Sequence, residues 1–84
     1  MNARIRKRIH KITDLCIDSK DFGHDCFYGF QPHVNKINFD FYKDGWEKGK
    51  ESILYEDIKL NGPETIEKLD NVIKLLEQLI EESV

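Results

Sequence analysis

Apolar residues recur every three or four positions at the start of the chain, which is the spacing of one face of an α-helix. The stripe consists of Ile5, Ile9, Ile12, Leu15 and Cys16, and mostly basic or polar residues occupy the positions between them. This pattern predicts an amphipathic helix over about 3–17. The short polar stretch at 19–23 then predicts a connection.

Three segments in which apolar and polar residues alternate come next, and such alternation is the period of a half-buried strand. We expect strands at about 25–31, 35–43 and 52–60. The second is the clearest, because Ile37, Phe39 and Phe41 alternate with more polar residues. Pro32 ends the first strand in a turn at 31–35, and a long hairpin loop at 43–50 leads to the third strand.

A second helix is predicted over 63–82, with Pro63 at its first position. Its apolar residues cover about half of the circumference, which is wider than the ~100° stripe that covers a sheet. They are Ile66, Leu69, Val72, Ile73, Leu75, Leu76, Leu79 and Ile80. This width predicts that the helix also packs on the first helix or reaches a partner subunit.

These elements predict a single α+β domain over 1–84 with the order αβββα. Both helices would pack on one face of a three-stranded antiparallel meander. The buried face of that sheet would carry Tyr28, Phe30, Ile37, Phe39, Phe41, Leu54, Ile58 and Leu60. The opposite face would stay open, as antiparallel sheets allow.

The composition is that of a soluble globular protein, with 39% hydrophobic and 35% charged residues. No apolar run approaches the ~20 residues needed to cross a bilayer, and the basic first segment lacks the apolar stretch of a secretory signal. The two cysteines are too few for a disulfide scaffold, so we expect a reducing cytoplasm. Residues with AT-rich codons are abundant, which favours a low-GC bacterium or one of its phages as the source.

Cys16, His24, Cys26 and His33 are the residues best suited to hold a metal ion. Their spacing lacks the close cysteine pair and the close histidine pair of common structural zinc sites. Both cysteines also continue apolar stripes, as small buried side chains do. We therefore expect no metal, no cofactor, no catalytic cysteine and no enzymatic activity.

Charge is divided unevenly, since residues 1–20 carry a net charge of +4 and residues 21–84 one of −7. The basic first helix makes a nucleic-acid-binding regulator an alternative function. Its cationic residues are Arg4, Arg6, Lys7, Arg8 and Lys11. However, the isoelectric point of about 5.5 is well below the ~9 that is typical of nucleic-acid-binding domains. Nucleic acid is therefore not the expected partner.

The open sheet face would combine aromatic and acidic side chains, and the hairpin loop would place Trp46 beside it. Aromatic residues are the usual hot spots of protein interfaces, whereas acidic residues repel phosphate. The candidate partner-binding residues are Phe27, Asp40, Tyr42, Trp46, Tyr55 and Asp57. In an equally weighted alternative, Trp46 folds back over the sheet and covers these rings.

The sequence thus predicts a non-enzymatic, cytoplasmic protein-binding module with no membrane partner. Its most specific form is a phage or mobile-element inhibitor that occupies a basic, nucleic-acid-handling site on a host protein. Anti-CRISPR proteins and bacterial immunity proteins are similar in general character, because they too are small and acidic. A further alternative is a structural module that forms a homodimer through the wide apolar face of the C-terminal helix.

Overall fold

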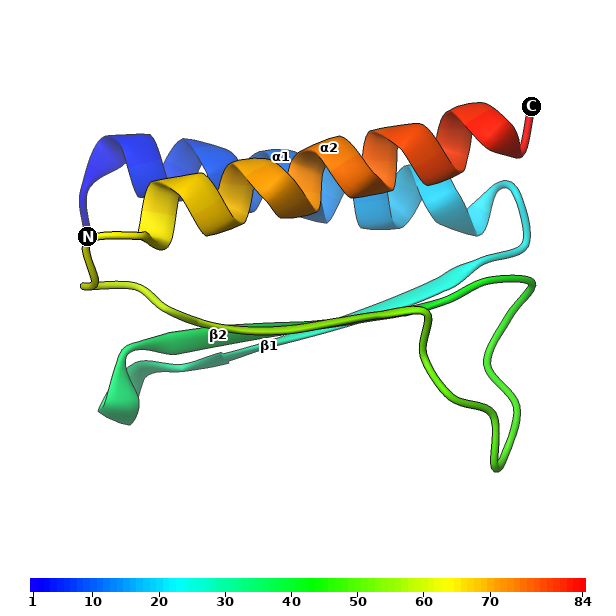
Figure 1. Ribbon diagram of the computed structural model, residues 1–84, viewed down its shortest axis with the longest axis horizontal. Coiled ribbons are helices and arrows are strands. Elements are labelled where there is room, and N and C mark those ends of the chain that lie inside the picture. The colour runs from blue at the N-terminus through cyan, green and yellow to red at the C-terminus, as the bar shows by residue number, and fades with distance from the viewer.

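Two helices lie side by side on one face of a three-stranded sheet in the computed structural model, which describes residues 1–84 (Figure 1). Helix α1 spans Ala3–Lys20 and helix α2 spans Thr65–Glu82. Between them lie strands β1 (Asp25–Gln31), β2 (Lys36–Tyr42) and β3 (Leu54–Lys59). The αβββα order and the α+β class confirm the prediction from the sequence. No helix has the combination of length and apolar character that a membrane span requires.

The sheet is an antiparallel meander in the order β1-β2-β3, so β2 is its central strand. A short 3₁₀ turn over Pro32–Val34 joins β1 to β2 and ends at Asn35, whose φ of 55° lies in the left-handed region. Asparagine tolerates that conformation better than most residues. The predicted turn at 31–35 is therefore confirmed.

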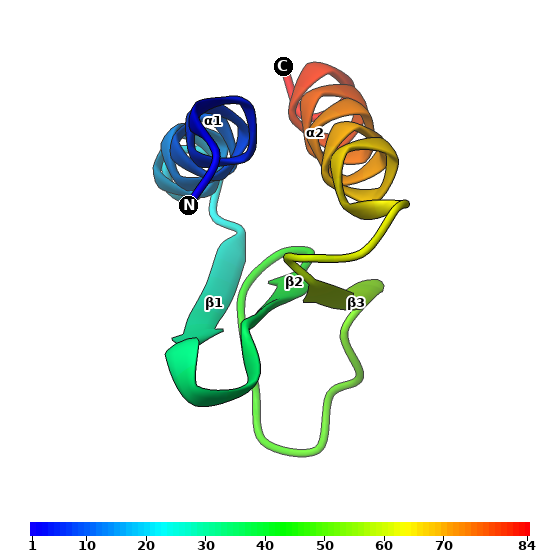
Figure 2. The same cartoon turned by 90° about the vertical axis from the view of Figure 1, so that its left-hand side faces the viewer.

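The two helices run in the same direction, with α1 above β1 and α2 above β3 (Figure 2). An ion pair of 2.7 Å between Arg8 Nε and Asp70 Oδ1 joins them. The wide apolar face of α2 is used for packing against α1 and the sheet, since Leu75 is its only exposed apolar residue. A homodimer through this face stays a prediction, and the structure leaves little apolar surface of α2 for it.

One cluster of twelve buried apolar residues fills the space between the helices and the sheet. Its members are Ile5, Ile12, Leu15, Cys16, Ile37, Phe39, Phe41, Ile58, Leu60, Leu69, Val72 and Leu76. The centre of the cluster is the inner face of β2, where all three apolar residues are 1% exposed. The alternation in the sequence predicts this face correctly.

The prediction that Tyr28 and Phe30 are buried is wrong. Both rings point toward the helices, but they are 49% and 52% exposed. The reason is that β1 is an edge strand, so these rings have a neighbouring strand on one side only. Alternation predicts which face a side chain occupies, but it carries no information on how far the helices extend over the edge.

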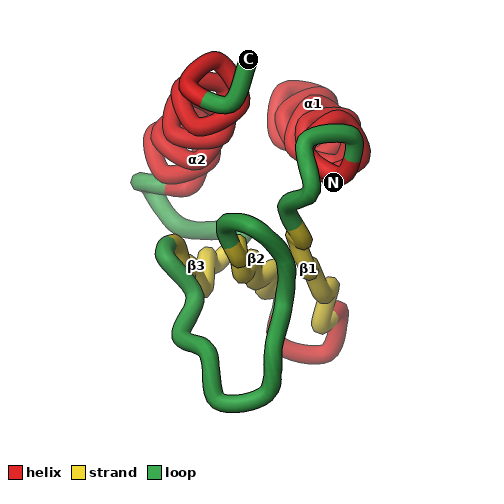
Figure 3. The backbone as a smooth tube through the Cα atoms, turned by 90° about the vertical axis from the view of Figure 1, so that its right-hand side faces the viewer, coloured by secondary structure: helices red, strands yellow, loops and turns green.

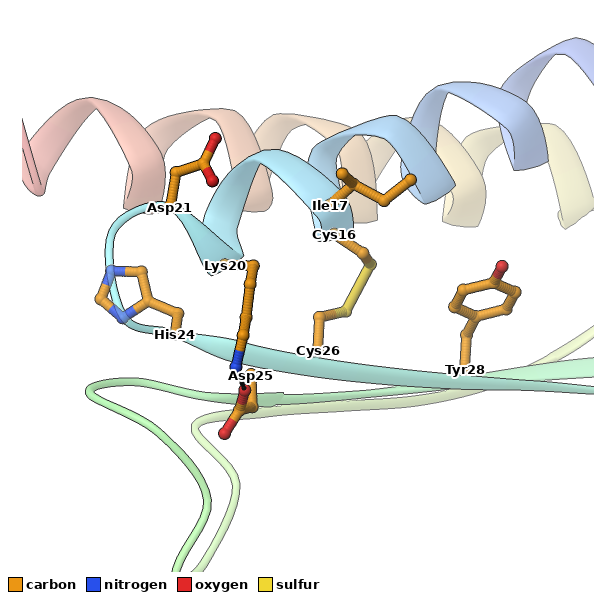
Figure 4. Close-up of a pocket in the computed structure, with 8 residues that line it drawn as sticks. All are labelled: Cys16, Ile17, Lys20, Asp21, His24, Asp25, Cys26 and Tyr28. Carbon is orange, nitrogen blue, oxygen red and sulfur yellow. Dashed lines mark hydrogen bonds and ion pairs between the residues drawn. A yellow bond between two sulfur atoms is a disulfide. The ribbon is translucent and has the colours of Figure 1, made fainter.

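The expectation of unpaired cysteines is also wrong, because Cys16 in α1 and Cys26 in β1 form a disulfide (Figure 4). Each cysteine occupies the predicted apolar face of its own element, and these faces meet. The cysteine argument for a reducing compartment therefore loses its basis, since disulfides are rare in the cytosol. The cytoplasmic location itself stays a prediction.

Both helices differ from their predicted bounds at one end. Helix α1 continues to Lys20, three residues past the predicted end. Helix α2 begins at Thr65, and Pro63 lies in the preceding turn instead of at the first helical position. The Thr65 hydroxyl donates to Lys59 O at 2.6 Å and accepts from the N–H of Gly62 at 3.1 Å. These bonds hold the segment between Lys59 and Thr65 in a turn, so the helix begins only at Thr65.

Candidate functional site

The face of the sheet away from the helices carries a row of side chains that crosses all three strands. Phe27 in β1 pairs with Asp40 in β2, and Asp40 pairs with Tyr55 in β3. Both aromatic rings are more than half exposed, and no helix covers this side (Figure 2). A carboxylate therefore lies between two aromatic residues at the middle of the open face.

The long loop between β2 and β3 adds a third aromatic group to this surface. The loop projects to the side of the sheet that the helices leave free (Figure 3), and its Trp46 is 53% exposed. Trp46, Phe27, Asp40 and Tyr42 line a shallow hollow of about 340 Å³. The rings of Phe27 and Tyr42 meet edge to face, with their centroids 5.8 Å apart. Trp46 thus borders the hollow without closing it.

Asp25 holds the backbone of Trp46 in place. Its Oδ2 atom accepts the N–H of Trp46 at 2.8 Å, and its Oδ1 atom accepts the ammonium group of Lys20 at 3.2 Å. The Trp46 hydrogen bond is the main cause that lowers the pKa of Asp25 below its ordinary value of 3.8, and Lys20 lowers this pKa further. Asp25 is therefore a positioning residue for the tryptophan.

His24 binds the same loop at Asp44, two residues before Trp46. Its Nδ1 atom accepts the N–H of Asp44 at 2.9 Å, so Nε2 carries the hydrogen and donates to Ser83 Oγ at 2.7 Å. The Ser83 hydroxyl in turn donates to Leu79 O at 2.8 Å. The buried His24 ring thereby connects the end of α2 to the start of the loop, and both of its nitrogens are occupied.

The start of the loop has a conformation that its residues permit. Asp44 and Gly45 both have positive φ, at 61° and 94°, and glycine adopts this region without steric cost. The ammonium group of Lys50 donates to the carbonyl oxygens of Lys43 and Gly45, which closes the loop on itself. Trp46 is therefore presented by a turn that is bonded on several sides.

The carboxylates of the open face differ in whether they are paired. Asp57 lies one row beyond Asp40 and forms an ion pair of 3.7 Å with Lys36. Asp40 takes part in none of the ion pairs of the structure and its side chain accepts no hydrogen bond. Lys59 pairs with Lys36 across the strands at the far end of the face, so these two lysines lie away from Asp40.

Of the six candidate residues, four lie together around the hollow: Phe27, Asp40, Tyr42 and Trp46. Tyr55 adjoins them through its pairing with Asp40, whereas Asp57 is set apart by its ion pair with Lys36. The alternative in which Trp46 covers the rings is not the conformation seen, because Phe27, Tyr55 and Trp46 are all exposed.

The four cysteine and histidine residues best suited to hold a metal ion do not form a cluster. The cysteines are bonded to each other, and His24 is bonded to Asp44 and Ser83. His33 lies in the turn at the opposite end of β1. The structure holds no group of three or more side chains that could bind a metal ion.

The sequence reasoning missed the roles of His24 and Asp25. His24 directly precedes β1 and Asp25 is its first residue, and polar residues are common at the start of a strand. The loop groups that they bind are backbone N–H groups about twenty residues away, so no motif marks the pair. In comparisons with protein-family models, curated proteins and solved structures, nothing matched this chain. The function is therefore inferred from the geometry of the site.

Proposed function

We propose that this chain is a non-enzymatic protein-binding module whose interface is the hollow around Asp40. The observation that supports this proposal is the contrast among the carboxylates of the open face. Asp40 has no cationic partner within the chain, although it lies among exposed aromatic rings, while Asp25 and Asp57 each have a lysine. A partner that brings a cation to Asp40 would complete the site.

An arginine side chain of the partner suits this site best. Its guanidinium group forms bidentate hydrogen bonds with a carboxylate and also stacks on aromatic faces. Phe27, Tyr42 and Trp46 around Asp40 offer such faces. A cation–π contact is worth about 2 kcal/mol when it is removed from water, so a single well-placed arginine would act as a hot spot.

The most specific form of the proposal is an inhibitor, encoded by a phage or a mobile element, that occupies a basic nucleic-acid-handling site on a host protein. Sites that bind phosphates are rich in arginine and lysine, which are the groups that the hollow would accept. The net charge of −3 favours association with such a surface. Anti-CRISPR proteins and bacterial immunity proteins are similar in general character, because they too are small and acidic.

The second candidate function is nucleic-acid binding through α1. In its favour, Arg4, Arg6, Lys7 and Lys11 are exposed and take part in no ion pair, whereas Arg8 is bound to Asp70. Against this alternative, the chain as a whole has a net charge of −3, which disfavours association with a polyanion. Both candidates are distinguished by the same experiment.

The experiment begins with recovery of the partner by affinity purification from a low-GC bacterial lysate, followed by binding titrations of variants. Trp46→Ala and Asp40→Asn should each weaken binding by about 2 kcal/mol or more, as is typical of hot spots. Asp57→Asn is the matched control, because this carboxylate is already paired with Lys36, and it should change affinity by less than about 1 kcal/mol.

Replacement of Arg4, Arg6 and Lys7 by glutamine should leave the affinity for the protein partner nearly unchanged. If these replacements abolish binding while Trp46→Ala preserves it, the sheet-face proposal is wrong. A steep loss of DNA or RNA affinity with salt would then identify α1 as a nucleic-acid-binding surface.

A further inference from the structure

A second apolar surface lies on the other side of β1, between this strand and α1. One hollow of about 360 Å³ is bordered by Ile9, Tyr28 and Phe30, with Met1, Arg6, His10 and Ile37. A second hollow of about 340 Å³ lies further along and is also bordered by Tyr28, together with Ile17 and the disulfide (Figure 4). The two hollows share Tyr28 as a border, and we refer to them together as the α1–β1 groove.

β1 is an edge strand, and its residues Cys26, Tyr28 and Phe30 border this groove. Every alternate residue of an edge strand directs its N–H and C=O groups away from the sheet, where they are available to another strand. β1 has no proline and only one charged residue among its seven, namely Asp25 at its start. The other edge strand, β3, has three charged residues among its six, and charge is a common protection against pairing. β1 is therefore the less protected edge.

Charge at one end of the α1–β1 groove indicates what would bind there. Arg6 and His10 border the hollow near the start of α1, and neither takes part in an ion pair. At the other end, Lys20 is already paired with Asp25. Asp21 and His24 also border this other end. The groove is thus apolar in its middle part, around Tyr28, and has unpaired basic groups at one end only.

From this geometry we infer that the α1–β1 groove binds an extended segment of a partner protein as a fourth strand beside β1. Apolar side chains of this segment would enter the two hollows, and an acidic side chain would lie next to Arg6 and His10. Residues 26 and 30 of β1 are about 13 Å apart at the rise of a strand, so the two apolar anchors would be four positions apart. This surface is separate from the hollow around Asp40, and the inference does not depend on the proposed function.

A second copy of the chain fits the α1–β1 groove less well. Helix α1 lies above β1 (Figure 2). Two copies joined through β1 would therefore place their α1 helices about 5 Å apart, at the spacing of neighbouring strands. Packed helices need axes about 8–10 Å apart. An isolated strand has no such helix and avoids this clash.

The test uses a displayed library of random linear peptides long enough to span β1, selected on the full, oxidised chain. Enriched peptides should have alternating apolar residues and an acidic residue at one end. Each selected peptide is then synthesised in two forms that are N-methylated at alternate residues. Strand addition predicts that one form loses binding by about tenfold or more and the other retains it, because only alternate amides face β1.

The position of the acidic residue is tested by exchanging charges. Arg6→Glu should weaken binding of the acidic peptide, and a peptide with lysine in place of its acidic residue should recover affinity for this variant. Arg4→Glu is the matched control, because Arg4 is exposed on the same helix but does not border the groove. Trp46→Ala should have no effect on peptide binding, which separates this inference from the proposed function.

Three outcomes would overturn the inference. The first is that selection enriches no peptide with this pattern. The second is that both N-methylated forms bind as well as the parent peptide, which would exclude strand addition. The third is that sedimentation shows a dimer that Phe30→Lys converts to monomer, which would identify a second copy as the occupant.

Discussion

His24 and Asp25 are adjacent in the chain, and each binds one backbone N–H group of the loop that carries Trp46. Neither side chain belongs to the hollow around Asp40. Their effect is on geometry, because a tryptophan contributes to an interface only where its ring is held in a suitable position. The position of the Trp46 backbone therefore depends on two polar residues at the start of β1.

Acidification should release Trp46 from Asp25. The pKa of this carboxyl is lowered in the folded state from its ordinary value of 3.8. The hydrogen bond that the ionised carboxylate accepts from the N–H of Trp46 is therefore fully present above pH 3.8 and is lost as the pH falls below that value. Trp46 is the only tryptophan, so its fluorescence emission reports this change directly. The emission of the wild type should shift below pH 3.8 before far-UV circular dichroism changes.

The Asp25→Asn variant provides the control for this titration, because its amide does not ionise in this range. Its emission should not change until the whole fold is lost. If wild type and variant give the same emission profile, Asp25 does not control the position of Trp46.

At the scale of single elements, β2 determines the core. It is the central strand, and Phe39 lies on its inner face at 1% exposure. Phe39→Ala should reduce the free energy of unfolding by about 3–5 kcal/mol, since it removes a fully buried ring and leaves a cavity. Phe27→Ala on the opposite face is the control, and it should cost less than about 1 kcal/mol of stability because its ring is half exposed. Denaturant titrations followed by circular dichroism would measure both, and equal midpoints would contradict the sheet assignment.

The sequence predicts elements well where their residues repeat with a clear period. β1 is predicted with its observed bounds, and the inner residues of β2 are all buried as expected. Contacts between elements are harder to predict, because periodicity is local. The exposure of Tyr28 depends on how far α1 covers the edge of the sheet at β1. The Cys16–Cys26 bond depends on the apolar faces of α1 and β1 packing together with the two cysteines opposite each other. Two cysteines on facing apolar stripes, with a short connection between them, were the available signal.

Strand alternation predicts the part of the candidate site that lies on the strands. Phe27, Asp40 and Tyr55 share a face because each lies at the outward position of its strand, and pairing brings them into one row. The place of Trp46 could not be derived in this way, since its loop is fixed by bonds to distant residues. The sequence likewise could not show that Asp57 is paired while Asp40 is free.

At the scale of the whole molecule, the disulfide joins α1 to the sheet and closes a loop between residues ten positions apart. Closing a loop of this size restricts the unfolded chain and stabilises the fold by about 2–3 kcal/mol. The Cys16→Ala, Cys26→Ala double variant should therefore melt at a lower temperature than the oxidised wild type. A reductant should lower the melting temperature of the wild type and leave that of the double variant unchanged. An identical melting curve with and without reductant would show that the bond contributes nothing to stability.

Strand β1 contributes to both proposed surfaces, with Phe27 on the open face and Tyr28 and Phe30 at the α1–β1 groove. Under these two proposals, neighbouring residues of one strand would be exposed to different selective pressures. Among relatives of this chain, loss or exchange of one partner should change every second residue of residues 25–31 and leave the intervening residues as they are. An insertion of one residue within β1 would exchange the two sets of side chains between the two faces and abolish both interactions at once.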